Sequence, residues 1–279
     1  MYRLIALDMD GTLLNSQKQV GRETAAALRE AAACGKYAVY CTGRGPIELI
    51  DFRELLPEVK YAICNNGATL WDMQDWKMTE GSEVAPELIR NILETSRKEE
   101  HLLQLYSGAD VIYDRYSEEM IEKVGLGEYI PLYRRIVKTV DGYEETLLSG
   151  GSGFEEIRVN KFSVHLTGIA PRERLKKKLD RLGLPVEIRR SNRYTLEITA
   201  AGVSKAYGLR RICEELQIPA EETIAVGDGG NDLDVMKAAG LAIAVGNAAD
   251  EVKKIADVLV ADNDHDGCAE AIRKYLIGN

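Results

Sequence analysis

Side chains that can bind ions and phosphate-like groups stand in four short polar segments, each directly after an apolar run. The segments are Asp8-Met9-Asp10-Gly11-Thr12, Thr42-Gly43-Arg44, Asn65-Asn66-Gly67 and Gly227-Asp228-Gly229-Gly230-Asn231-Asp232. The four segments are unusually polar for chain that directly follows apolar runs. They are therefore candidates for one site, provided that the fold brings them together.

The elements around these segments predict that it does. Short apolar runs alternate with amphipathic helical stretches at both ends of the chain, a pattern typical of a parallel sheet covered by helices. The expected strands are residues 4–7, 37–41, 61–64, 223–226, 241–245 and 258–260. Ligands of such doubly wound α/β folds bind outside the carboxyl ends of the strands. The four polar segments follow strands, so we expect them to converge there.

The middle of the chain has a different rhythm. From about Glu83, a helical stretch is followed by two strands, at 102–106 and 111–113, with no helix between them. Residues 161–166 alternate apolar and polar side chains, which predicts a half-buried strand. We therefore expect residues 83–191 to form an inserted α+β domain with an open-faced antiparallel sheet, and residues 1–82 and 192–279 to form the core. The run 148–153, rich in Ser and Gly, predicts a flexible loop.

Bulk properties exclude several classes of protein. The 279 residues carry a net charge of −9, which disfavours a general nucleic-acid-binding protein. Five cysteines without a CxxC pair indicate neither a disulfide framework nor a structural zinc site. No apolar stretch approaches the length of a membrane span. We expect a cytoplasmic protein, a monomer or homodimer, that acts on a small molecule and has no nucleic-acid or membrane partner.

The motifs together resemble the haloacid dehalogenase superfamily, and their order around a mid-chain insertion is similar to its Cof-type branch with a type IIB cap. They are DxDGT after the first strand, a Thr ending the second, an isolated Lys205, and GDxxND after a later strand. Further matches are Ala-Val-Gly-Asn at 244–247 and Asn263-x-x-x-Gly267. Each motif is a modest signal, but jointly they are specific and span nearly the whole chain. One departure is Ala206, where glycine is common.

The resemblance implies a magnesium-dependent phosphatase that hydrolyses a small phosphate monoester, such as a sugar phosphate or a phosphorylated cofactor, through an aspartyl-phosphate. Asp8 is the implied nucleophile and Asp10 the general acid and base, with nearby carboxylates expected to keep Asp10 protonated. Asp8, the backbone carbonyl of Asp10 and Asp228 are the implied Mg²⁺ ligands, and Asp232 or Asn231 is expected to act mostly through water.

The resemblance also assigns the phosphate-binding groups. Thr42 and Lys205 are expected to hold the phosphoryl oxygens, and Gly43 to add a backbone N–H. Arg44 and Asn231 are expected to bind substrate. The inserted domain would set specificity, although the sequence does not name the substrate.

Other interpretations remain open. Asp-x-Asp-Gly alone can be a turn or a calcium loop, but Gln19 stands where an EF-hand needs Glu. Lys176-Lys177-Lys178 is interpreted as a solvated helix face without function. A phosphomutase or phosphotransferase would use the same loops, and a phospho-acceptor signalling module places Asp, Thr and Lys at strand ends too. The long insertion and the DxDGT motif oppose the signalling module.

Overall fold

The chain forms two compact units. The structure, a computed structural model, describes residues 1–149, 158–191 and 193–278. The first unit comprises Met1–Arg44, Leu49–Glu80 and Ser204–Asn279, and the second comprises Gly45–Glu48 and Gly81–Val203. Among the described residues, no helix is both long and apolar enough to cross a membrane.

An eight-stranded sheet forms the centre of the first unit, in the order β14-β13-β12-β1-β2-β3-β4-β5. Its strands are β1 (Leu4–Leu7), β2 (Tyr37–Cys41), β3 (Tyr61–Cys64), β4 (Thr69–Asp72), β5 (Lys77–Gly81), β12 (Thr223–Gly227), β13 (Leu241–Ala244) and β14 (Val258–Leu259). β1 is parallel to both β2 and β12, so all three have their carboxyl ends at one edge of the sheet. The predicted doubly wound parallel sheet is confirmed. An antiparallel pairing of β3 with β4 extends it.

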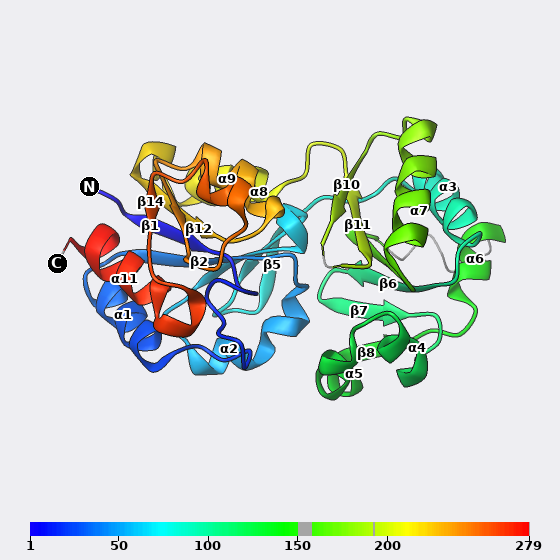
Figure 1. Cartoon of the computed structure of the whole chain (residues 1–279), viewed down its shortest axis with the longest axis horizontal. Coiled ribbons are helices and arrows are strands. Elements are labelled where there is room, and N and C mark those ends of the chain that lie inside the picture. The colour runs from blue at the N-terminus through cyan, green and yellow to red at the C-terminus, as the bar shows by residue number, and fades with distance from the viewer. Residues whose placement is uncertain (150–157, 192, 279) are drawn as a thin grey trace. The chain divides into compact units, whose positions relative to one another are not determined.

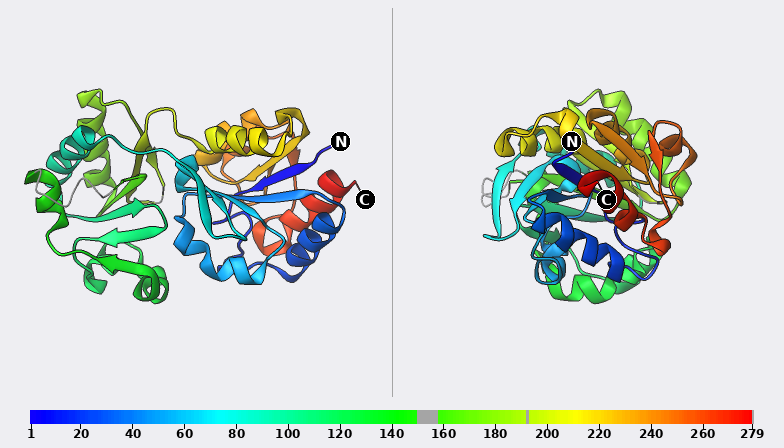
Figure 2. Two further views of the ribbon diagram at one scale, coloured as in Figure 1. Left: turned by 180° about the vertical axis from the view of Figure 1, so that it is seen from behind. Right: turned by 90° about the vertical axis from the view of Figure 1, so that its left-hand side faces the viewer.

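Helices cover both faces of this sheet. The elements are α1 (Arg22–Ala33), α2 (Ile50–Leu55), η2 (Asn65–Gly67), α8 (Lys205–Leu216), η4 (Ala220–Glu222), η5 (Gly230–Asp232), α9 (Leu233–Ala238), α10 (Asp250–Lys253), η6 (Asn263–His265), α11 (Gly267–Ala271) and the π-helix η7 (Ile272–Ile277). α8 and α9 pack together on one face, and α1 packs with α11 and η7 on the other (Figures 1 and 2). Apolar strands such as β1 are therefore buried on both sides.

The second unit contains a six-stranded sheet in the order β10-β11-β9-β6-β7-β8. Its strands are β6 (His101–Ser107), β7 (Asp110–Tyr113), β8 (Val137–Thr139), β9 (Lys161–Leu166), β10 (Val186–Arg190) and β11 (Thr195–Ala200). The pairing is antiparallel except between β7 and β8. Because β11 pairs with β9 and β10, this unit reaches Val203 and not residue 191 as expected. The alternating pattern of β11 predicted a strand but could not say which sheet it joins.

Helices lie on both sides of the second sheet. The elements are α3 (Pro86–Ser96), α4 (Glu118–Lys123), η3 (Gly127–Tyr129), α5 (Ile130–Ile136), α6 (Tyr143–Ser149) and α7 (Ile169–Leu182), and η1 (Pro46–Leu49) precedes α2. α3, α6 and α7 share one apolar cluster with the sheet, and α4 and α5 share another with Leu102 and Tyr113. The predicted loop at 148–153 begins instead as the end of α6, and its residues 150–153 lie outside the described part of the chain.

The prediction that β9 is half-buried is wrong. All six of its side chains are buried, including Lys161, Ser163 and His165. The Lys161 Nζ donates to Glu197 Oε1 at 2.8 Å, and the His165 ring nitrogens contact Thr195 Oγ1 and Gln104 Oε1 at 2.7 and 2.8 Å. Apolar and polar residues alternate as predicted, but the polar side chains Lys161 and His165 are buried and contact side chains of neighbouring strands.

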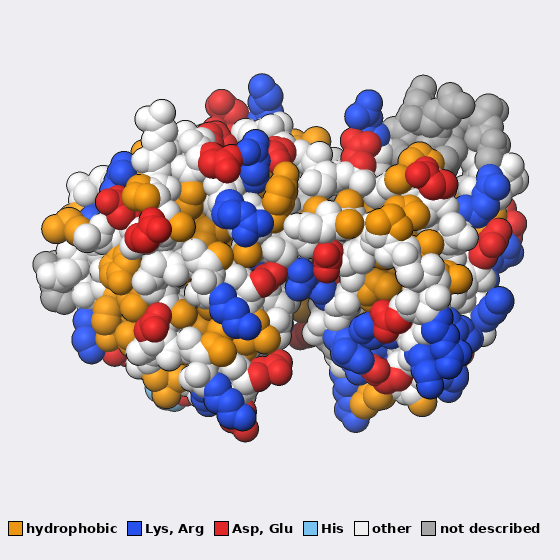
Figure 3. Space-filling view, turned by 90° about the horizontal axis from the view of Figure 1, so that it is seen from above, with side chains coloured by type: hydrophobic (Ala, Val, Ile, Leu, Met, Phe, Trp, Pro, Cys, Tyr) orange, Lys and Arg blue, Asp and Glu red, His pale blue; other side chains and the backbone are white. Residues whose placement is uncertain are grey.

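Lysine and arginine side chains gather over part of the second unit in Figure 3. Many basic groups of α7 and β10 are paired: Lys176 with Asp180, and both Arg172 and Arg190 with Glu173. These pairs are compatible with the interpretation of residues 176–178 as part of a solvated charged face.

Candidate active site

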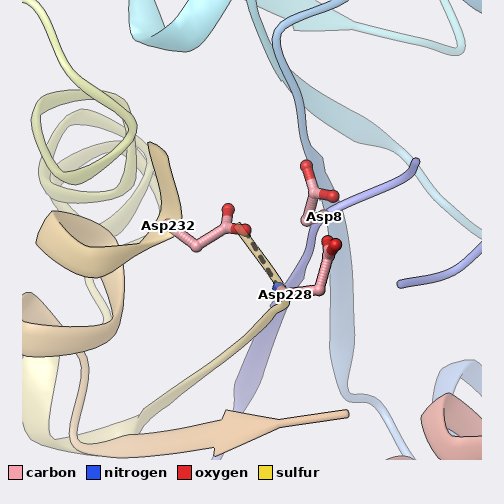
Figure 4. A group of neighbouring side chains, drawn as sticks. All are labelled: Asp8, Asp228 and Asp232. Atoms are coloured by element: carbon pink, nitrogen blue, oxygen red, sulfur yellow. Dashed lines mark hydrogen bonds between the residues drawn. The ribbon is translucent and has the colours of Figure 1, made fainter. Parts of the chain in front are cut away.

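Three aspartate side chains meet at the carboxyl ends of β1 and β12. Asp8 directly follows β1, Asp228 directly follows β12, and Asp232 precedes α9. One carboxylate oxygen from each lies within 4.8 Å of those of the other two, and Figure 4 shows the side chains turned toward each other. Asp8 and Asp232 are buried, and Asp228 is half-buried. The parallel alignment of β1 and β12 brings together residues separated by 220 positions in the chain.

Lys205 lies against this group from the first turn of α8. Ser204 caps the helix, since its side chain accepts a hydrogen bond from the Tyr207 N–H. The fully buried Lys205 ammonium donates to Asp8 Oδ1 at 2.5 Å and to Asp232 Oδ1 at 2.6 Å. Gly67 allows this approach, because a Cβ there would lie 1.9 Å from the Ser204 carbonyl oxygen.

Burial dominates the electrostatics of the group. It raises the pKa of Asp8 well above its usual value, against the attraction of Lys205 and with the support of Asp232 and Asp228. Burial and the Asp232 charge likewise raise the pKa of Asp228. Burial opposes the charge of Lys205, but Asp232 and Asp8 outweigh it and raise the Lys205 pKa. The three carboxylates of this largely buried site thus have the ammonium group of Lys205 to offset their charge.

These residues fit a divalent metal ion. Three converging carboxylates offer the all-oxygen ligands that Mg²⁺ prefers, and a cation would offset the charge that burial makes unfavourable. Both Asp232 oxygens are already engaged, one by Lys205 and the other by the backbone N–H groups of Asp228 and Gly229. Asp8 and Asp228 are consequently the better candidates for direct contact with the metal ion.

The environment of Asp10 differs from the expected one. Arg44 donates to both carboxylate oxygens, at 2.7 Å each, and the Lys18 Nζ adds a third contact at 3.1 Å. Burial alone would raise the pKa of Asp10, but Arg44 and Lys18 together lower it to about 2. Asp10 is therefore held as a carboxylate, and the expectation that neighbouring carboxylates keep it protonated is wrong.

The loop after β2 is fixed by the loop after β3. Thr42 is buried, its Oγ accepts from the Arg44 N–H at 3.1 Å, and its carbonyl accepts from the Asn66 N–H at 3.0 Å. The Arg44 carbonyl accepts from the Asn65 N–H at 2.9 Å. Both asparagines have positive φ, which this residue type tolerates better than most. Gly43 lies between these anchored residues, so the polar segments after β2 and β3 act as one structure.

Asn231 lies in the turn that carries the acidic group. Its side-chain oxygen is 2.9 Å from the position that a Cβ on Gly229 would occupy. The residue is half-buried beside Asp232. This position keeps Asn231 near the carboxylates through the loop, and its expected role toward substrate stays a prediction.

Several residues contribute contacts to the site although the sequence predicted no role for them. Lys18 contacts Asp10 from a position with φ +58°, and no feature of the sequence indicated it. Thr12 donates to Asp228 Oδ1 at 2.9 Å. Asn247 donates to the Gly11 carbonyl at 2.7 Å, and Asn263 donates to the Leu14 carbonyl at 2.8 Å. Both asparagines belong to recognised motif matches, which signalled them without showing what they contact.

Comparison with known proteins agrees with this geometry. A family model described as haloacid dehalogenase-like hydrolase matches residues 5–272. The 5-amino-6-(5-phospho-D-ribitylamino)uracil phosphatase YcsE of Bacillus subtilis is 30% identical over 99% of this chain and 96% of its own. The pyridoxal phosphate phosphatase YbhA of Escherichia coli is 28% identical over 99% of both chains.

A solved structure of a haloacid dehalogenase-like hydrolase from B. subtilis superimposes with a TM-score of 0.87 at 26% identity. The similarity covers 98% of this chain and 99% of that one. The family model and the relatives all extend through the second unit, so the similarity is not limited to the acidic loops. The chain belongs to the haloacid dehalogenase-like hydrolase family, in the Cof-type branch that its motifs indicated.

Proposed function

We propose that this protein is a magnesium-dependent phosphatase of small phosphorylated metabolites that works through an aspartyl-phosphate on Asp8. The observation that carries the proposal is the convergence of Asp8, Asp228 and Asp232, two of which, Asp8 and Asp232, accept hydrogen bonds from the buried Lys205 ammonium. Mg²⁺, when bound, would neutralise the repulsion between a carboxylate nucleophile and an anionic phosphoryl group.

The chain's own residues supply the other parts of the reaction. A carboxylate oxygen of Asp8 forms a bond to phosphorus while the bond to the leaving oxygen breaks, and water later hydrolyses the acyl phosphate. Lys205 and the loop Thr42–Arg44 would bind the phosphoryl oxygens. Asp10 would give the leaving oxygen its proton. For that step Asp10 must carry a proton, so its contacts with Arg44 must give way when the substrate is bound.

The names of the relatives support a class of substrate. One is named for a phosphorylated ribitylaminouracil and another for pyridoxal phosphate, and both molecules are small phosphate monoesters. A fold shared with such enzymes does not transfer the substrate itself. We propose a metabolite of this size and assign the choice of leaving group to the second unit.

Phosphate release from a panel of monoesters tests the proposal. The panel contains sugar phosphates, pyridoxal phosphate, flavin mononucleotide, the ribitylaminouracil phosphate and p-nitrophenyl phosphate, without an added acceptor. We expect turnover of several members with Mg²⁺, and a loss of at least about 10³-fold in Asp8→Asn, because a carboxamide lacks the nucleophilic charge. Asp75→Asn, an exposed change, is the control.

The proposal fails if Asp8→Asn stays within about tenfold of the wild type. Phosphate transfer that requires a sugar acceptor would identify a mutase or phosphotransferase instead. Phosphorylation of Asp8 without turnover would identify a phospho-acceptor module.

A further inference from the structure

Two asparagine side chains tie the loop after β1 to the loops after β13 and β14. Asn247 donates through Nδ2 to the Gly11 carbonyl at 2.7 Å and accepts through Oδ1 from the Asn263 N–H at 3.1 Å. Asn263 donates through Nδ2 to the Leu14 carbonyl at 2.8 Å. Asn247 and Asn263, here called the asparagine clasp, thus form a continuous chain of hydrogen bonds from the Gly11 carbonyl to the Leu14 carbonyl.

The clasped loop carries groups of the acidic site. Gly11 joins Asp10 to Thr12, and fixing its carbonyl fixes the peptide plane between Gly11 and Thr12. Gly11 has a φ of +83°, and a Cβ there would lie 2.7 Å from Asp228 Oδ2. The Thr12 hydroxyl donates to the other Asp228 oxygen. The hydrogen bond to the Gly11 carbonyl therefore restrains the backbone next to Asp10. It also restrains Thr12, whose hydroxyl contacts Asp228.

A second anchor continues the clasp along the same loop. Asp264 follows Asn263 and accepts from both the N–H and the hydroxyl of Ser16, at 2.8 and 2.5 Å. Ser16 lies two residues before Lys18, which contacts Asp10. The loop is thereby held at three points, on Gly11, Leu14 and Ser16, by side chains that come from beyond β13.

The effect of a variant on the catalytic rate and its effect on the free energy of unfolding distinguish a positioning role from a purely structural one. Asn247 is exposed, and a single exposed hydrogen bond contributes little to the free energy of unfolding. A small displacement of reacting groups, by contrast, can lower a rate by about 10²-fold. If the clasp contributed only to stability, its removal would change both the rate and the free energy of unfolding only slightly. If the clasp positions Asp10 and Asp228, its removal would change the rate far more than the stability.

We propose that Asn247 and Asn263 are positioning residues for phosphoryl transfer, which act through the Gly11 and Leu14 carbonyls to hold the Asp10–Thr12 segment in its reactive geometry. The inference rests on the proposed phosphatase function. It assigns to these asparagines an effect on the transition state and not on substrate binding.

The test uses the full chain with Mg²⁺ and the best substrate from the panel. Asn247→Ala and Asn263→Ala remove the clasp. Asn247→Asp keeps an acceptor for the Asn263 N–H but removes the donor to Gly11. Asn91→Ala is the matched control, because Asn91 is exposed and its side chain donates to the Glu87 carbonyl of its own helix. We measure kcat, KM, Tm, and inhibition by orthovanadate and by inorganic phosphate.

We expect all three clasp variants to lose at least about tenfold in kcat, with KM within about twofold and Tm close to that of the control. Inhibition by vanadate, which mimics the transition state, should weaken with kcat, whereas inhibition by phosphate should not. The double variant Asn247→Ala/Asn263→Ala should lose little more than either single one, since the two bonds form one chain.

Three results would overturn the inference: wild-type kcat in the variants, wild-type kcat in Asn247→Asp alone, or a raised KM at unchanged kcat, which would make Asn247 a substrate contact. Failure of the proposed function is distinguishable from these, because the wild type itself would then release no phosphate from any monoester.

Discussion

Among single residues, the pKa of each aspartate in the site depends on which basic side chain contacts it. Lys205 is shared by Asp8 and Asp232, whereas Arg44 and Lys18 both contact Asp10. Two aspartates only two positions apart thus have pKa values shifted in opposite directions. These directions are the reverse of those that an ionised Asp8 and a protonated Asp10 require, so the proposed mechanism needs a bound cation beside Asp8 and the loss of the contacts between Arg44 and Asp10 when substrate binds.

The Asp10 pKa predicts a pH dependence of stability. The folded value of about 2 lies below the unfolded value near 3.9, so ionised Asp10 stabilises the fold at neutral pH. This contribution is fully present above about pH 4 and is lost as the pH falls toward 2. Urea unfolding of the wild type and Asp10→Asn at pH 7, 5, 4 and 3 should show a difference that is constant at first and shrinks below pH 4. A difference that grows with acidity would contradict the ion pairs.

Metal selectivity is the second residue-scale prediction. Ca²⁺ readily takes a carboxylate through both oxygens, whereas the nucleophile needs one oxygen free for attack. Asp8 already gives one oxygen to Lys205. We expect Mg²⁺ to support turnover and Ca²⁺ to inhibit it, measured as initial rates while Ca²⁺ is titrated against fixed Mg²⁺. Equal rates with the two ions, or full activity in excess chelator, would exclude this account.

Among the helices and strands, close packing of one backbone against another positions the side chains of the site. The start of α8, which carries Lys205, lies directly against η2 at Gly67. Lys205 can reach Asp8 only if this approach is kept. The polar face of the second sheet shows the same dependence on neighbours, because Lys161 is buried between Glu197 and the Tyr106 ring.

Gly67→Ala should therefore be severely destabilising. Gly67 has a φ of +97°, and the added Cβ would meet the Ser204 carbonyl oxygen at 1.9 Å. Gly35→Ala is the control, since Gly35 also has a positive φ, but its Cβ would have no atom within 4 Å. We expect Gly35→Ala to cost about 1 kcal/mol and Gly67→Ala at least about 2 kcal/mol more in urea unfolding. If both variants were destabilised equally, the backbone around Ser204 would have moved to accommodate the added Cβ without cost.

The buried pair Lys161–Glu197 gives the second element-scale prediction. Glu197→Leu leaves the buried ammonium without this carboxylate and should cost about 3–5 kcal/mol. Adding Lys161→Met should recover most of that loss, because no charge then remains buried. Asp110→Ala removes the exposed Lys138–Asp110 pair of the same sheet and should cost less than about 1 kcal/mol. Chemical denaturation measures all three, and a double variant as unstable as the single one would refute the argument.

At the scale of the whole molecule, the second unit is an insertion whose boundaries follow strand pairing. β11 lies after residue 191 but is hydrogen-bonded to β9 and β10. Its Leu196 and Ile198 are buried in the apolar cluster of that unit. The insertion is therefore complete only from Gly81 to Val203.

Two deletions test this boundary. Replacing residues 83–191 with a short Gly-Ser linker leaves β11 without its partners and exposes an apolar strand edge, so we expect aggregation. Replacing 81–203 removes the sheet as a whole and should give a larger soluble fraction by size-exclusion chromatography. The turnover of p-nitrophenyl phosphate by the soluble fraction then reports the core alone. Equal solubility of the two proteins would show that β11 belongs to the core.

Most of the parallel sheet of the first unit could be predicted from the sequence, whereas β4 and β5 were not predicted. β1, β2 and β3 match the predicted residues because a strand buried on both faces must be continuously apolar, a pattern that is local in the chain. The polar segments were recognisable for the same reason, since each begins where an apolar run stops. Their order along the chain was enough to indicate the family that the comparisons show.

The contacts of the proposed catalytic residues could not be predicted from the sequence. The Arg44 side chain could have faced solvent or substrate, and only the fold directs it to Asp10, which overturned the expected protonation state. The polar side chains of β9 looked solvent-exposed but are buried with partners from other strands. Local patterns record whether a side chain is polar or apolar. Its pKa and its partner depend on charges brought near by residues distant in sequence, and this information is absent from any short stretch of the chain.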